Sequence, residues 1–97
     1  MTTTPKARML EAQKLYEQIK EDNAALRAFE DVLSAAFERM GRMQTYYQDS
    51  WMEDMDTLDK AGENIEVMGQ DPIYNEMEDQ YAAVKRIILK CAEYINR

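Results

Sequence analysis

The chain has 97 residues, with 12 basic and 19 acidic side chains, no His and one Cys. This composition excludes catalysis or metal binding that requires His or a pair of Cys side chains, and it excludes a disulfide within one chain. The length allows one small domain, and we expect residues 1–97 to form a single helical domain.

A long amphipathic helix is predicted in the first half of the chain. Thr4 followed by Pro5 is typical of a helix start, with Thr as the N-cap and Pro at the first helical position. Apolar side chains then alternate at intervals of three and four residues, as the a and d positions of a heptad do. These positions are Ala12, Leu15, Ile19, Leu26, Phe29, Leu33, Ala36, Met40, Met43 and Tyr47. The pattern predicts one helix to Tyr47, roughly 65 Å long if it is continuous.

Two positions interrupt this pattern. Asp22 occupies a d position and is followed by Asn23. Asp22 is then a solvated kink, a polar residue that fixes the heptad register, or the N-cap of a separate helix. Gly41 costs about 1 kcal/mol relative to Ala in a helix interior, and it either allows close packing or marks a fraying end.

A short helix is predicted between two turns in the middle of the chain. Ser50 and Glu53 fit a capping box at its start, and Gly62 fits a C-terminal cap at its end. Its apolar face is formed by Trp51, Met55 and Leu58. Residues 63–70 are interpreted as a loop whose apolar side chains, Ile65, Val67 and Met68, pack back onto the helices.

A closing helix is predicted at the end of the chain. Asp71 is its expected N-cap and Pro72 its first helical residue. Its heptad positions are all apolar or aromatic: Tyr74, Met77, Tyr81, Val84, Ile88, Cys91 and Ile95. At a d position, Cys91 is expected to be a small buried hydrophobic residue. Together the three segments predict an all-α fold, an antiparallel helical hairpin or bundle with a long N-terminal heptad helix, a short Trp-bearing helix and a closing C-terminal helix.

Charge is distributed unevenly. Residues 49–79 carry eleven acidic side chains and one basic one, Lys60, whereas residues 80–97 carry four basic side chains and one acidic one. An acidic surface repels phosphate backbones, so we expect no nucleic-acid binding. The acids between Asp49 and Asp59 lack the spacing and the Gly of a calcium loop, so we expect no metal, and no other cofactor is indicated.

Neither a signal peptide nor a membrane span is predicted. The segment Met1–Lys6 contains no apolar stretch, and no apolar run approaches the roughly 20 residues that cross a bilayer. We therefore expect a cytoplasmic protein that does not insert into membranes.

A cluster of aromatic and acidic residues surrounds the expected bend. The six members of this Tyr–Trp–Asp cluster are Tyr46, Tyr47, Trp51, Asp54, Asp71 and Tyr74. Trp51 is expected to dock against the two long helices near Tyr47 and Tyr74. Together with nearby Met side chains, the cluster either closes the core of the bundle or offers an adaptable patch to a partner, and the first interpretation is favoured.

The pattern of this cluster resembles the bacterial domain-of-unknown-function family 4298, small helical proteins with a YY…W..D…D..YN pattern. The resemblance implies a helical fold and no known activity.

The residue types favour a non-enzymatic protein-interaction module of unknown partner. The chain lacks the usual pairs of nucleophile and base, and it contains no Gly-rich phosphate loop. The alternative is a small secreted protein of the WXG type or one of the bacteriocin-immunity type, whose role its partner determines.

Self-association is expected because the closing helix is much shorter than the first helix. The closing helix can cover only about half of the first helix. The part left uncovered carries an apolar face that we call the N-terminal stripe and define as Ala12, Leu15, Tyr16 and Ile19. Either the first helix breaks at Asp22–Asn23 and folds back, or two chains pair their N-terminal stripes into a homodimer. Pairing is favoured because Asp22 and Asn23 come without Gly or Pro.

Overall fold

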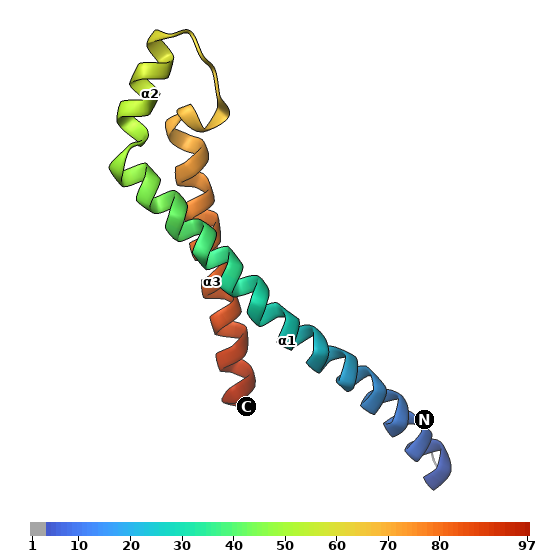
Figure 1. Ribbon diagram of the computed structural model, residues 1–97. Helices are drawn as coiled ribbons and strands as arrows, with labels where there is room; N and C mark the ends of the chain where they lie inside the picture. Colours follow the sequence, from blue (N-terminus) through green and yellow to red (C-terminus); the bar gives the residue numbers. More distant parts are fainter. Residues whose placement is uncertain (1–3) are drawn as a thin grey trace. The chain divides into compact units, whose positions relative to one another are not determined.

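The computed structural model describes residues 4–97, which are mostly helical and contain no strand (Figure 1). Helix α1 spans Pro5–Asp49, α2 spans Trp51–Lys60, the 3-10 helix η1 spans Glu66–Met68 and α3 spans Gln70–Ile95. The predicted all-α fold, with a long first helix, a short Trp-bearing helix and a closing helix, is confirmed. Met1–Thr3 lie outside the described residues. The expectation that the N-terminal segment is not a signal peptide rests in part on these residues.

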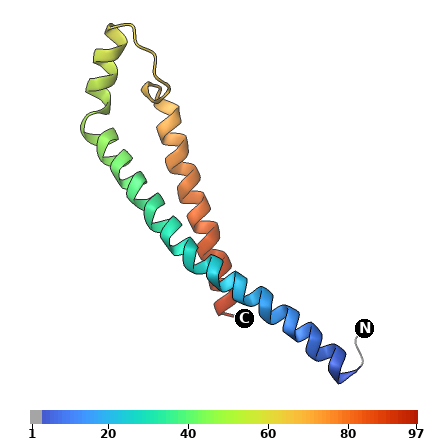
Figure 2. The ribbon, with the colours of Figure 1, turned by 45° about the vertical axis from the view of Figure 1, so that its right-hand side comes forward.

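The chain divides into two compact units, Met1–Gly41 and Arg42–Arg97. Within the described residues the first unit consists of α1 alone. The second contains the last two turns of α1 together with α2, η1 and α3. In this second unit the chain reverses after α2, so that α3 runs in the opposite direction to α2 (Figures 1 and 2). No helix within residues 4–97 has both the length and the apolar content that crossing a membrane requires.

The start of α1 is capped as predicted. The backbone N–H of Ala7 donates to Thr4 Oγ1 at 3.1 Å, and the N–H of Arg8 donates to the Thr4 carbonyl at 3.0 Å. The Thr4 hydroxyl thereby satisfies one of the N–H groups that a first helical turn leaves without partners, and the Thr4 carbonyl accepts the first bond of the helix. The prediction of Thr4 as N-cap is confirmed.

Helix α1 continues without a break through Asp22 and Asn23 and ends at Asp49, two residues beyond the predicted end. The amide of Gln18 donates to Asp22 Oδ1 at 3.5 Å, an interaction across one turn that fits a helical surface. The carboxylate is thus accommodated on the helix, and the alternative of a separate N-terminal helix is not what the structure adopts.

The predicted capping box at the start of α2 is wrong. Ser50 is the N-cap residue, but its side chain makes no capping hydrogen bond, and its φ of −133° and ψ of −16° are not extended. The reason is that Ser50 continues the helical bonding. Its N–H donates to the Tyr46 carbonyl at 2.9 Å, and its own carbonyl accepts from Asp54 N–H at 3.0 Å. Helices α1 and α2 are therefore joined through one residue rather than by a loop.

The end of α2 is closed by Gly62, as predicted. Gly62 has a φ of +80°, and its N–H donates to the Asp59 carbonyl at 3.0 Å. The next N–H, of Glu63, donates to the Leu58 carbonyl at 3.0 Å. This pair of bonds is a Schellman motif, in which the left-handed residue is usually Gly because it has no Cβ.

Helix α3 begins two residues earlier than predicted. Its first residue is Gln70 and its N-cap is Gly69 in an extended conformation, so Asp71 is not the N-cap and Pro72 is not the first helical residue. Pro72 still lies in the first turn, where its missing N–H deprives the helix of no internal bond. A Cβ on Gly69 would lie 3.2 Å from Pro72 Cδ, so a larger residue at this N-cap would crowd the proline ring.

The buried side of α3 is offset from the predicted heptad stripe. Ile73 is buried and Met77 and Val84 are half-buried, whereas Tyr74, Tyr81, Ile88 and Ile95 are between 56% and 76% exposed. The prediction that Cys91 is buried is wrong, because this side chain is exposed. Helix α3 contacts η1. Cys91 lies 18 residues beyond the buried Ile73, which places it roughly 27 Å farther along the helix.

Replacement of the two glycines Gly41 and Gly62 by Ala is expected to have opposite effects. Gly62→Ala should lower the free energy of unfolding by about 1–2 kcal/mol, because Ala adopts the left-handed conformation at that cost. Gly41→Ala should raise it by about 0.5–1 kcal/mol, because Gly41 lies inside α1 and a Cβ there has open space. Thermal and urea unfolding followed by circular dichroism measure both effects. Equal changes in the two variants would contradict the assignment of Gly62 as the helix cap.

Candidate functional site

The best-defined site in the second unit is built around Trp51, the first residue of α2. Its side chain is 4% exposed, and its Nε1–H donates to the backbone carbonyl of Val67 at 2.7 Å. An indole N–H can only donate, and burying it without an acceptor is costly, so the Val67 carbonyl makes the burial of the ring possible. The bond joins the start of α2 to η1 across 16 residues of sequence.

The Trp51 ring also packs against the end of α1. Its centroid lies 5.1 Å from that of Tyr47, with an angle of 28° between the planes. Such stacked pairs contribute about 0.5–1.5 kcal/mol beyond the area they bury. The predicted contact between Trp51 and Tyr47 is confirmed.

A second link across the junction of α1 and α2 is polar. The phenol of Tyr46 donates to Asp54 Oδ2 at 2.9 Å. This hydrogen bond to the Asp54 carboxylate raises the pKa of Tyr46 above its usual value, with smaller contributions from partial removal from water and from the negative charge of Asp54. Tyr46 and Tyr47 thus hold α2 by different means, one through a charged acceptor and the other through its ring.

A small cavity of about 80 Å³ lies beside Trp51. It is lined by Tyr46, Trp51, Asp54, Met55, Leu58, Ile65, Val67 and Met68. The predicted return of Ile65, Val67 and Met68 toward α2 is therefore found. The lining is almost entirely apolar, and its one polar pair, Tyr46 and Asp54, is engaged in a hydrogen bond.

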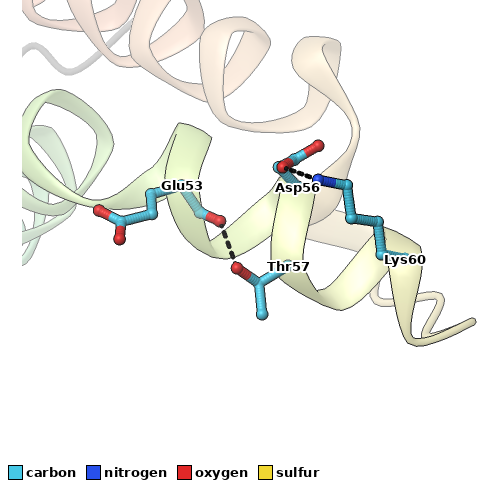
Figure 3. Close-up of polar contacts among 4 residues, drawn as sticks. All are labelled: Glu53, Asp56, Thr57 and Lys60. Atoms are coloured by element: carbon cyan, nitrogen blue, oxygen red, sulfur yellow. Dashed lines mark hydrogen bonds and ion pairs between the residues drawn. The ribbon is translucent and has the colours of Figure 1, made fainter.

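The outer side of α2 is acidic and polar. A wider hollow of about 580 Å³ is lined by Gln48, Asp49, Met52, Glu53, Met55 and Asp56. On the same helix Thr57 Oγ1 donates to the Glu53 carbonyl at 3.0 Å, and Lys60 pairs with Asp56 at 3.0 Å (Figure 3). Both partners of that ion pair are well exposed, so it contributes less than about 1 kcal/mol. Within residues 4–97 no group of three or more His, Cys, Asp or Glu is placed to hold a metal ion.

The structure brings together four of the six members of the Tyr–Trp–Asp cluster: Tyr46, Tyr47, Trp51 and Asp54. The other two, Asp71 and Tyr74, lie in the first turns of α3 and are exposed, Tyr74 by 56%. Sequence reasoning did not predict which apolar residue of α3 is buried or which group accepts the indole hydrogen bond. Ile73 is the buried residue of this part of α3. The signal that could have indicated it is an apolar residue directly beside Tyr74, a member of the predicted cluster. Val67 acts through its backbone carbonyl, for which a side chain gives no signal.

The hydrogen bond between Tyr46 and Asp54 makes the stability of the protein depend on pH in the alkaline range. Because the Tyr46 pKa is raised by folding, the stability that this bond contributes is fully present below the unfolded tyrosine pKa of about 10 and is lost as pH rises through the folded pKa. Asp54→Asn should lower the Tyr46 pKa, since an amide oxygen is a weaker hydrogen-bond acceptor than a carboxylate and carries no negative charge.

The tyrosinate absorbance of the protein minus that of its Tyr46→Phe variant isolates the titration of Tyr46. The same subtraction in the Asp54→Asn background should give a midpoint at lower pH. Identical midpoints in the two backgrounds would show that Asp54 does not accept the phenol hydrogen bond in solution.

Comparison with protein-family models, with curated proteins and with solved structures found no match to this chain. The resemblance to domain-of-unknown-function family 4298 therefore stays a prediction, carried by the residues around Trp51.

Proposed function

We propose that the chain is a non-enzymatic helical interaction module, and that its N-terminal stripe pairs with the same stripe of a second copy to form a homodimer. The proposal includes the cytoplasmic location expected from the sequence and the resemblance to domain-of-unknown-function family 4298. The observation that carries it is the apolar surface along the first turns of α1.

The exposure of the N-terminal stripe supports pairing. Leu15, Tyr16 and Ile19 are 64%, 55% and 52% exposed, and Ala12 is exposed as well. The first unit contains no element other than α1 among its described residues, so it has nothing of its own with which to cover this face. Burial of an a and d seam against an identical helix is the usual solution for such a sequence.

The continuity of α1 also favours pairing over back-folding. A third helix made of residues 5–20 requires a break near Asp22, and α1 has none. An unbroken helix presents Leu15 and Ile19 on the same side as Leu26, which is 63% exposed. The apolar seam available to a second chain is thereby longer than the N-terminal stripe alone.

The surroundings of Trp51 support a structural role rather than a catalytic one. Its indole N–H is bonded to a backbone carbonyl, and the neighbouring Tyr46 and Asp54 are bonded to each other. These polar groups hold helix ends together. The cavity they border is apolar and about 80 Å³ in volume, which leaves room for little more than one small apolar group.

Substitution of two stripe residues tests the pairing. The wild-type chain should have a mass above its monomer value of 11.4 kDa at tens of micromolar, measured by sedimentation or light scattering. Leu15→Asp with Ile19→Asp should lower that mass while leaving most of the helical circular dichroism, because it places two charges in the paired seam.

The matched control is Ala24→Asp with Ala28→Asp. These two exposed residues have the same spacing of four and lie on the opposite side of α1. The control should keep the wild-type mass. A wild-type mass of 11.4 kDa under these conditions, or an equal effect of the two double variants, would defeat the proposal.

A further inference from the structure

Helix α3 carries an exposed apolar surface that the packing of the second unit does not use. We define the α3 stripe as Tyr74, Tyr81, Ile88 and Ile95, which follow one another at intervals of seven residues and are between 56% and 76% exposed. A spacing of seven keeps these side chains on one side of the helix. The buried Ile73 lies on a neighbouring side, so the α3 stripe is a second apolar surface and not part of the core.

The charges of α3 are separated along its length. Residues 70–79 contain four acidic side chains, Asp71, Glu76, Glu78 and Asp79, and no basic one. Residues 80–97 contain four basic side chains, Lys85, Arg86, Lys90 and Arg97, and one acidic one, Glu93. One half of the helix is therefore negative and the other positive. A partner that matches both the α3 stripe and this charge separation must present the reverse order of charges.

We propose that α3 pairs in antiparallel orientation with α3 of a second copy of this chain through the α3 stripe. An antiparallel copy brings the acidic half of each helix against the basic half of the other, whereas a parallel copy would bring like charges together. The same surface thus supplies both the apolar contact and its own charge complement.

Two charged residues border the α3 stripe and give the pairing a register. Glu78 follows Tyr74 by four residues and Lys85 follows Tyr81 by four, so both lie on the side of the stripe. The Lys85 Nζ lies 5.2 Å from the centroid of the Tyr81 ring, which places it at the edge of the stripe. A crossing centred between Tyr81 and Ala82 sets Glu78 of each copy opposite Lys85 of the other.

This contact is independent of the proposed pairing of the N-terminal stripe, because it involves a different helix. The experiment therefore uses the full chain carrying Leu15→Asp and Ile19→Asp, which we call the background chain. Any association that remains in the background chain does not depend on the N-terminal stripe.

Charge exchange in the background chain tests the α3 contact. The background chain should form a dimer in sedimentation equilibrium. Lys85→Glu alone and Glu78→Lys alone should each raise its dissociation constant at least about tenfold, because two attractive pairs become repulsive. An equimolar mixture of the two variants should associate as tightly as the background chain, since each then meets its opposite charge.

The matched controls make the same charge changes elsewhere on α3. Lys90→Glu and Glu76→Lys alter exposed residues on the side away from the α3 stripe. Each should change the dissociation constant less than about twofold. Helical circular dichroism checks that every variant is folded.

The possible results separate the two proposals. A background chain that stays monomeric while the wild type associates overturns the α3 contact and leaves the N-terminal pairing standing. A background chain with the wild-type mass overturns the N-terminal pairing, and the α3 contact then stands if the mixture restores association. Equal effects of Lys85→Glu and Lys90→Glu, or a mixture that stays dissociated, overturn the α3 contact.

Discussion

One hydrogen bond, from the indole of Trp51 to the carbonyl of Val67, determines how the second unit is organised. The ring can be buried only because its N–H has an acceptor, and the acceptor lies in a segment that the chain reaches only after reversing direction. A typical bond of this kind contributes about 0.5–1.5 kcal/mol, and a buried N–H left without a partner costs about 1–3 kcal/mol. The bond therefore fixes the end of α2 nearest α1 relative to η1, which in turn contacts α3.

Helix α2 depends on such external support. It has ten residues, and isolated helices shorter than about 12–15 residues are marginal in water. Its first residue is held by the stacked Tyr47 and the Val67 carbonyl, the rest of its first turn by the bond from Tyr46 to Asp54, and its end by the left-handed Gly62. The exposed ion pair on its outer side adds little. The anchors at its two ends, rather than helix propensity, explain why this segment is helical.

The features that a few neighbouring residues decide could be predicted from sequence, and those that depend on distant segments could not. Gly62 was identifiable as a cap because a residue without a Cβ adopts the left-handed conformation at little cost, whatever the rest of the chain does. Ser50 and Asp71 have the right chemistry for N-caps, but backbone bonding continues through Ser50, whose side chain makes no capping hydrogen bond, and the N-cap of α3 is Gly69 instead of Asp71. On α3 the heptad period was apparent, but two adjacent apolar sides were available. Which one is buried follows from the packing of the unit. At the site, the contact of Trp51 with Tyr47 was predictable, whereas the exposure of Tyr74 and the role of the Val67 carbonyl could be located only from the fold.

The most direct test of the account is the hydrogen exchange of the Trp51 indole N–H, followed by nuclear magnetic resonance. The chain has one Trp, so its indole resonance is unambiguous. If the bond to Val67 holds the second unit together, this proton exchanges only when the unit opens, and its exchange slows by at least about a hundredfold relative to a free indole. Exchange at the rate of a solvent-exposed indole, with the helical circular dichroism intact, would contradict the account.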